Sequence, residues 1–233
     1  MKPLFIYLIR HGESEGNIDS VLYEHIPDWK INLTEKGKQQ AIEVGKRLLA
    51  DYQSSISKLS LETSMNLLFR PDFIIYSSPW YRARETTALI GNSIKAKIRE
   101  DPRLREQEWG NYAEDHLKRK IKLERKEFGT FFYRMPYGES GADVYDRITT
   151  FIDTMHRDFE KKLYPVATII VSHGLTIKAF FTRFFHWSFE QFDGYKNPEN
   201  CEIFKMELDD SLNKYVLKTP MKLRVEFKKD ISK

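Results

Sequence analysis

The sequence has one cysteine and no long hydrophobic run. Cys201 is the only cysteine among 233 residues, which excludes an intrachain disulfide and a metal centre built from several cysteines. The apolar run near the start of the chain, Leu4 to Ile9, ends at Arg10 and is too short for a membrane span or for the hydrophobic region of a signal peptide. We therefore expect a protein of a reducing compartment, the cytoplasm by default, without insertion into a membrane.

The sequence also lacks linkers and internal repeats. No tract rich in glycine, serine or proline divides the chain, and no segment recurs with a period of about 20 to 50 residues. Hydrophobic residues make up 41% of the chain and charged residues 31%, which is enough apolar side chain for a sizeable core. We expect a single domain over residues 1–233, with residues 219–233 as a C-terminal tail.

The excess of positive charge is concentrated in one segment. The net charge is +4, and residues 116–128 alone hold six Lys and Arg residues against two Glu. The rest of the chain is neutral on balance, which argues against a nucleic-acid-binding face and suits a small anionic ligand. The basic residues between 118 and 126 are either the solvated face of a helix, which is the simpler interpretation, or a lid over a pocket.

Hydrophobic patterning predicts strands alternating with helices. Residues 4–9, 72–76 and 166–171 are short apolar runs typical of strands buried on both faces. Residues 203–208 indicate a more exposed edge strand, paired with residues 215–217. Such alternation predicts an α/β fold, a three-layer sandwich with helices on both faces of a mainly parallel sheet.

Helix signals lie between these strands. Thr34 can cap a helix whose periodicity fades near Asp51, and residues 54–70 favour a surface helix. Ser78 followed by Pro79 predicts a helix start, because proline is favoured at the first helical position. Ser140 to Asp143 is typical of a capping box that opens a long helix. A further apolar helix is expected up to Phe185.

Each buried strand runs directly into a polar turn. The turns are Arg10-His11-Gly12, Ser77-Ser78-Pro79 and Ser172-His173-Gly174. Ligands of open α/β sheets bind outside the carboxyl ends of the strands, so neighbouring strands would bring these turns to one pocket. Arg82, one turn into the second helix, can point into the same space. Two imidazoles and two guanidinium groups without a carboxylate cluster make a poor metal site and a good phosphoryl site.

Five motifs occur in an order that is typical of one enzyme family. They span most of the chain and resemble those of the histidine phosphatase superfamily, also called the phosphoglycerate-mutase-like family. The motifs are Arg10-His11-Gly12-Glu13-Ser14-Glu15-Gly16-Asn17, residues 33–41, Ser77-Ser78 with Arg82, Leu104-Arg105-Glu106 with Gly110, and Ser172-His173-Gly174.

The resemblance implies a role for each matching residue. His11 is implied as the nucleophile that takes the phosphoryl group, and Glu106 as the proton donor that later activates water. Arg10, Arg82 and His173 are implied as ligands of the phosphoryl oxygens, with Asn17 adding a contact. These roles also make chemical sense, because a neutral imidazole is a competent nucleophile near pH 7. Two arginines with a charged His173 would stabilise the transition state, so no metal is then required.

Two neighbours compete for these roles. Arg84 lies two residues from Arg82, and helical geometry lets only one of them face the pocket. Glu108 is the corresponding rival of Glu106. The register of the motifs favours Arg82 and Glu106 over these neighbours.

Two reactions are compatible with the resemblance. Transfer from the phosphohistidine to water gives a phosphatase, whereas transfer to a bound phosphoglycerate gives a mutase that needs 2,3-bisphosphoglycerate. Gly16 stands where the mutases carry Trp, Gln107-Glu108-Trp109 replaces their Arg-His-Tyr, and the segment from Gly110 to Gly138 is shorter than theirs. Residues 105–111 and 138–147 look more like the plant and fungal phosphoglycerate-mutase-like proteins, whose fungal members are phosphatases.

We therefore predict a metal-independent phosphomonoester hydrolase that acts on a small phosphorylated substrate. The mutase is the alternative, and a binding protein that has lost turnover is a second one, although both His11 and Glu106 are present. No cofactor and no nucleic-acid partner are expected, and a homodimer is compatible with the sequence.

Overall fold

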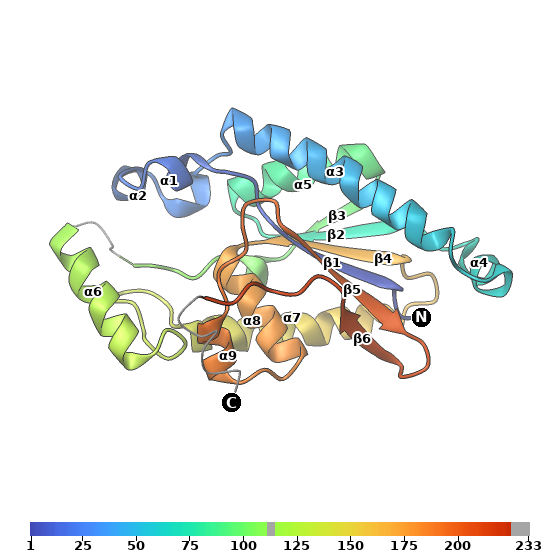
Figure 1. Ribbon diagram of the computed structural model, residues 1–233. Coiled ribbons are helices and arrows are strands. Elements are labelled where there is room, and N and C mark those ends of the chain that lie inside the picture. Colours follow the sequence, from blue (N-terminus) through green and yellow to red (C-terminus); the bar gives the residue numbers. More distant parts are fainter. Residues whose placement is uncertain (111–114, 225–233) are drawn as a thin grey trace.

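The computed structural model describes residues 1–110 and 115–224. The described strands form one six-stranded sheet in the order β3-β2-β4-β1-β5-β6 (Figure 1). Strands β1 to β4 are mutually parallel, and β5 runs antiparallel to both β1 and β6. This confirms the predicted α/β fold with a mainly parallel sheet. The strands are β1 (Phe5–Arg10), β2 (Phe73–Ser77), β3 (Lys97–Glu100), β4 (Ala167–Ser172), β5 (Ile203–Asp209) and β6 (Lys214–Leu217).

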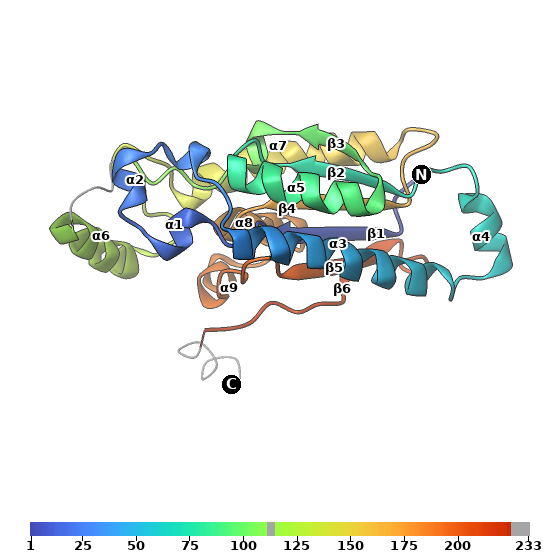
Figure 2. The ribbon, with the colours of Figure 1, turned by 90° about the horizontal axis from the view of Figure 1, so that it is seen from above.

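Helices cover both faces of this sheet. Helices α3 and α5 lie on one face, and α7, α8 and α9 lie on the other (Figures 1 and 2). The helical elements are α1 (Glu15–Ile18), α2 (Leu22–His25), η1 (Asp28–Lys30), α3 (Glu35–Ile56), α4 (Leu61–Leu67), α5 (Tyr81–Ile94), η2 (Pro102–Leu104), α6 (Asp115–Phe128), α7 (Gly141–Phe159), α8 (Gly174–Phe184) and α9 (Phe189–Gly194).

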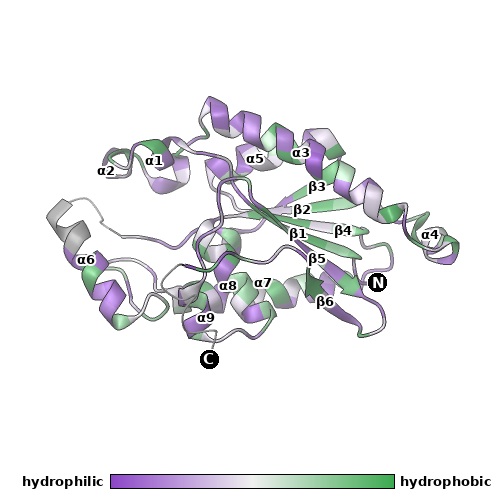
Figure 3. Cartoon of the chain, in the orientation of Figure 1, coloured by the Kyte–Doolittle hydropathy of each residue, from purple (hydrophilic) through white to green (hydrophobic). Residues whose placement is uncertain are grey.

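Two hydrophobic cores follow from the alternation of side chains along the strands. In β1, Tyr7 and Ile9 join the core beneath α3 and α5, whereas Ile6 and Leu8 join the core beneath α7 and α8. Because both of their faces are covered, β1, β2 and β4 are buried and mostly hydrophobic, whereas β5 and β6 include hydrophilic residues and α3 carries them on its outer side (Figure 3).

The carboxyl ends of β1, β2 and β4 meet at one edge of the molecule. β4 pairs with β1 on one side and with β2 on the other, so the three polar turns become neighbours. Helices α1, α2 and α6 lie at this end, and α4 lies at the opposite end (Figures 1 and 2). The fold therefore places the predicted catalytic residues at the edge of the sheet, at the end of the molecule where α1, α2 and α6 lie.

Several boundaries differ from the sequence predictions. Helix α3 continues five residues past Asp51 to Ile56, because Tyr52 extends its buried face and bonds Asp72 through its hydroxyl at 2.6 Å. Helix α5 begins at Tyr81 rather than at Pro79, since the Ser78 side chain is used in the turn. The predicted edge strand β5 is internal, and β6 forms the edge beside it.

The end of the described chain packs back on the body. Lys196 N donates to Lys222 O at 2.9 Å and Arg224 N donates to Gly194 O at 2.9 Å. The predicted tail, residues 219–233, lies partly outside the described residues, which end at 224. Within residues 1–110 and 115–224, no helix combines the length and the apolar content that crossing a bilayer requires.

Candidate active site

Hydrogen bonds assign the proton on the His11 imidazole. His11 directly follows β1, and its side chain is 3% exposed. Its Nδ1 atom lies 2.7 Å from the carbonyl oxygen of Gly12, which can only accept, so Nδ1 carries the proton. The Nε2 atom therefore presents its lone pair, to which Arg82 Nε donates at 3.3 Å. In this tautomer the Nε2 atom is unprotonated and is chemically able to act as a nucleophile.

His173 lies beside His11 and directly follows β4, as His11 directly follows β1. The two ring centroids are 5.1 Å apart, and the Trp80 indole packs edge-on against His173 at 5.1 Å. His173 Nε2 is 2.8 Å from Ser78 Oγ, the serine of the neighbouring turn. His173 Nδ1 is buried and has no hydrogen-bond partner among the described residues, so it is available to a ligand.

Two arginines complete a positively charged pocket. Arg82 is 3% exposed, packs over the Trp80 ring at 4.8 Å and pairs through Nη1 with Asp28 Oδ1 at 2.7 Å. Arg10 Nη1 donates to Pro198 O at 2.7 Å, while its buried Nε has no partner in the described part of the chain. Arg84 instead pairs with Glu100 at the surface. The structure thus places Arg82, rather than Arg84, beside His11.

Burial and the two arginines set the charge of both histidines. Removal from water and the nearby Arg82 and Arg10 hold the pKa of His11 well below its ordinary value. Burial, with Arg82 and His11, likewise lowers the pKa of His173. A lowered pKa favours the neutral ring in the ligand-free site, whereas the charged His173 expected in the transition state stays a prediction.

These two histidines should make folding stability depend on pH. The unfolded chain binds protons on both rings below about pH 6.5, whereas the folded chain excludes them. The free energy of unfolding should therefore fall as the pH decreases from 7.5 to 5.5, by up to about 1.4 kcal/mol per pH unit for each histidine. Urea unfolding of the wild type and of His11→Asn/His173→Asn tests this. Equal pH dependence of the two proteins would contradict it.

The Glu106 carboxylate is held by the first turn of helix α8, which directly follows His173. The carboxylate accepts hydrogen bonds from Leu175 N and Thr176 N, both at 3.2 Å, in the first turn of α8. Thr176 Oγ1 also donates to it at 3.1 Å. The Glu108 side chain is 54% exposed and contacts Arg105 instead. Of the two glutamates, Glu106 is therefore the one whose carboxylate lies at the N-terminus of α8, next to His173 in the chain.

Asn17 lies at the rim of the pocket. Its side-chain oxygen accepts from Ser14 N and from Asn200 Nδ2, both at 3.1 Å. Asn200 Nδ2 also donates to the backbone oxygen of His11 at 3.1 Å. These bonds orient the Asn17 amide and leave its nitrogen as the group that can meet a ligand.

Tyr23 occupies the space that Gly16 leaves open. A side chain at position 16 would meet the Tyr23 phenol, whose oxygen lies 2.6 Å from the place of a Cβ atom. Burial raises the pKa of Tyr23, while Arg82 and Arg10 oppose this shift and Asp28 adds to it. The phenol therefore belongs to the electrostatic environment of the pocket.

Sequence reasoning missed four residues of this site: Ser78 as a contact of His173, Asp28, Tyr23 and Asn200. Ser78 stood inside a predicted motif, so its place after β2 was a usable signal. The other three lie in segments without periodic patterning, and no sequence signal marks them.

The lysines of the basic segment whose side chains are described lie on a solvated helix face. Lys120, Lys122 and Lys126 are exposed, whereas Arg125 donates to Gln107 Oε1 at 3.3 Å and lies over the Trp109 ring. The side chains of residues 111–119 lie outside the described part. Among the described residues, no group of three histidine, cysteine or acidic side chains is arranged to hold a metal ion.

Comparisons with known proteins agree with this geometry. A family model described as histidine phosphatase superfamily (branch 1) matches residues 6–59 and 64–219. Phosphoglycerate mutase-like protein AT74 of Arabidopsis thaliana is 42% identical over 218 residues, covering 88% of this chain and 65% of AT74. Broad-range acid phosphatase DET1 of Saccharomyces cerevisiae is 28% identical, covering 94% of this chain and 89% of DET1. A solved mycobacterial glucosyl-3-phosphoglycerate phosphatase shares the fold, with a TM-score of 0.66, 18% identity and coverage of 93% and 98%.

Proposed function

The chain belongs to the histidine phosphatase superfamily, and we propose that it is a metal-independent phosphomonoester hydrolase that works through a phosphohistidine on His11. The observation that carries this proposal is the state of the His11 ring. Its Nδ1 proton is held by the Gly12 carbonyl, and its Nε2 lone pair faces a guanidinium group. A nucleophile of this form needs no added base and no metal.

In the first step, His11 Nε2 attacks phosphorus and the bond to the leaving oxygen breaks. Glu106 gives that oxygen a proton, so the alcohol leaves in its neutral form. Arg82 Nε moves from the His11 ring to a phosphoryl oxygen, and its ion pair with Asp28 is exchanged for the dianion. In the second step, Glu106 takes a proton from water and the water oxygen attacks phosphorus. The bond from phosphorus to His11 Nε2 breaks, the electron pair returns to Nε2, and inorganic phosphate leaves.

Two buried nitrogen atoms support a phosphoryl ligand. Arg10 Nε and His173 Nδ1 have no hydrogen-bond partner among the described residues, although both are removed from water. Unpaired buried polar groups are costly, and phosphoryl oxygens are acceptors that would satisfy them. The negative charge of a bound phosphoryl group would also raise the pKa of His173, because it counteracts the positive charges of Arg82 and Arg10.

Hydrolysis of p-nitrophenyl phosphate in the presence of EDTA tests the proposal. The purified chain should turn this ester over, and a radiolabelled phosphoryl donor should leave an acid-labile phosphohistidine on acid-quenched enzyme. Loss of activity in EDTA that is restored by a metal would overturn the metal-independent mechanism. Phosphate binding without turnover would favour the non-catalytic alternative.

Isomerisation of 3-phosphoglycerate should be slow beside hydrolysis of a generic phosphomonoester. The Tyr23 phenol fills the space next to Gly16, and Lys120, Lys122 and Lys126 of α6 are exposed to solvent. Water therefore reaches the phosphohistidine more readily than a retained phosphoglycerate does. The assay supplies 3-phosphoglycerate with catalytic 2,3-bisphosphoglycerate, and a mutase rate above the best hydrolysis rate would reverse the assignment.

A further inference from the structure

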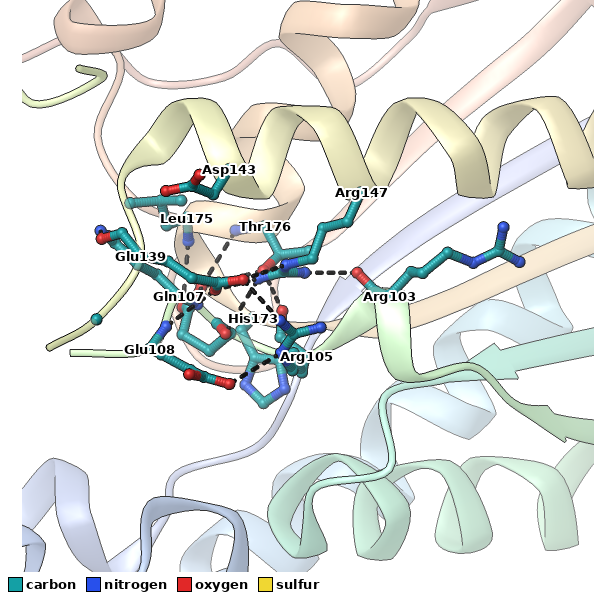
Figure 4. Close-up of polar contacts among 12 residues, drawn as sticks. Arg103, Arg105, Gln107, Glu108, Glu139, Asp143, Arg147, His173, Leu175 and Thr176 are labelled. Carbon is teal, nitrogen blue, oxygen red and sulfur yellow. Dashed lines mark hydrogen bonds and ion pairs between the residues drawn. The ribbon is translucent and has the colours of Figure 1, made fainter. Parts of the chain in front are cut away.

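A buried carboxylate lies directly behind the loop that carries Glu106. Glu139 Oε1 accepts from Arg105 Nη2 at 2.7 Å, and Glu139 Oε2 accepts from the backbone nitrogen of Glu108 at 3.1 Å (Figure 4). Its side chain is 12% exposed. One carboxylate therefore binds the residues on both sides of the Glu106–Gln107 pair.

Arg147 joins this carboxylate to the loop from helix α7. It donates to Glu139 through Nε and Nη2, both at 3.1 Å, and its side chain is 10% exposed. Nη2 also donates to the backbone oxygen of Glu106 at 3.1 Å, and Nη1 donates to Arg103 O at 2.5 Å. Arg147 thus contacts the backbone of the proposed acid residue itself.

The backbone of the two segments crosses at close range. Glu139 N donates to Glu108 O at 2.9 Å, and the buried Gln107 side chain donates to Glu139 O at 2.6 Å. Gly138 permits this approach, because a Cβ atom there would overlap the carbonyl oxygen of Glu108. Hydrogen bonds to Glu139 therefore fix the backbone of the loop at residues 107 and 108.

Helix α7 makes this support rigid. The capping box of Ser140 and Asp143 starts the helix directly after Glu139, and Val144, Ile148 and Phe151 are fully buried on its inner face. Glu106 is consequently held from two helices. Arg147 of α7 holds its backbone, and the first turn of α8 holds its carboxylate.

Stability alone is a poor explanation for this arrangement. Desolvation of a buried ion pair largely cancels its Coulomb attraction, and apolar residues of similar size often serve as well. The bonds of Arg147 and Glu139 converge on residues 103–108, which include the proposed acid. These hydrogen bonds therefore orient residues 103–108.

We infer that Glu139 and Arg147 are positioning residues, which act on the reaction by holding Glu106 at the leaving oxygen. This inference rests on the proposed function. Arg147→Gln and Glu139→Gln should slow hydrolysis of an alkyl phosphate by about 10- to 100-fold, the loss expected when a catalytic group is displaced by about 1 Å. Formation of the phosphohistidine from p-nitrophenyl phosphate should change far less, because that leaving group needs no proton.

A double-variant cycle separates positioning from general destabilisation. Glu106→Gln/Arg147→Gln should hydrolyse the alkyl phosphate no more slowly than Glu106→Gln alone, since Arg147 acts through the missing acid. Arg134→Gln is the matched control. Arg134 pairs with Asp143 in the same region, is 62% exposed and forms no hydrogen bond or ion pair with residues 103–108 in the described part of the chain. It should leave both rates unchanged.

The outcomes distinguish this inference from the function on which it rests. If Arg147→Gln fails to fold, Arg147→Lys and Glu139→Gln provide the same comparison with charge or shape retained. Folded variants that slow formation of the phosphohistidine equally from both esters, or that multiply the effect of Glu106→Gln, would refute the positioning role. A wild-type chain that forms no phosphohistidine would instead refute the proposed function.

Discussion

His11→Ala should lower the rate of phosphomonoester hydrolysis by about three orders of magnitude or more, while the protein stays folded. The substitution removes the Nε2 atom, which is the proposed nucleophile and lies beside Arg82. The backbone bond from His11 N to Ser172 O does not depend on the side chain, so β1 and β4 remain joined.

Rapid acid quenching measures the same loss directly. Wild-type enzyme mixed with a labelled substrate should carry acid-labile phosphate, and His11→Ala should carry none. His25→Ala is a matched control, because His25 is exposed at the end of α2 and touches neither histidine of the pocket. A folded His11→Ala protein that retains more than a few per cent of the wild-type activity would exclude the covalent mechanism.

Glu106→Gln should have the second largest effect, and its size should depend on the leaving group. An alkyl phosphate releases a strongly basic alkoxide, so loss of the proton donor should slow its hydrolysis by about 10² to 10⁴-fold. A p-nitrophenyl ester leaves as a stable anion, and formation of the phosphohistidine from it should be much less impaired. Pre-steady-state measurement isolates this first step from the second, in which Glu106 also activates water.

The neighbouring glutamate supplies the control for this experiment. Glu108→Gln changes a carboxylate of the same loop whose side chain is 54% exposed, and it should leave both first-step rates near the wild-type values. If Glu106→Gln slows both substrates by the same large factor in the first step, Glu106 is not the acid. A leaving-group effect on Glu108→Gln would then transfer the role to Glu108.

The place of the site could be predicted from local pattern because buried strands and polar turns leave a clear signature. The apolar run before Arg10 indicates a strand covered on both faces, and polar residues that follow such a strand have few places to lie except the sheet edge. The choice of Arg82 over Arg84 followed from motif register, and the burial of Arg82 agrees with it.

The features of the site that the sequence did not predict depend on contacts between segments that are distant in the chain. Asn200 donates to His11 O across 189 positions of the chain, and Asp28 pairs with Arg82 from the short helical turn η1, which has no periodic pattern. The charge of His173 depends on how completely the fold removes the ring from water, which a motif does not encode. Likewise, Tyr52 prolongs α3 because of a tertiary hydrogen bond, not because of its own helix propensity.

The pairing of β1 with β4 has a consequence for how the chain acquires its activity. Phe5 lies opposite Ala167 in the sheet, so the strand that presents His11 is made first and finds this partner only after most of the chain has left the ribosome. Its other neighbour, β5, is made later still. A contact of such high sequence separation closes slowly, and β1 is exposed as an unpaired apolar segment in the meantime. A chain truncated before residue 167 would therefore contain His11 but lack β4 and His173. Catalytic activity should appear only when β1 and β4 have paired in the sheet.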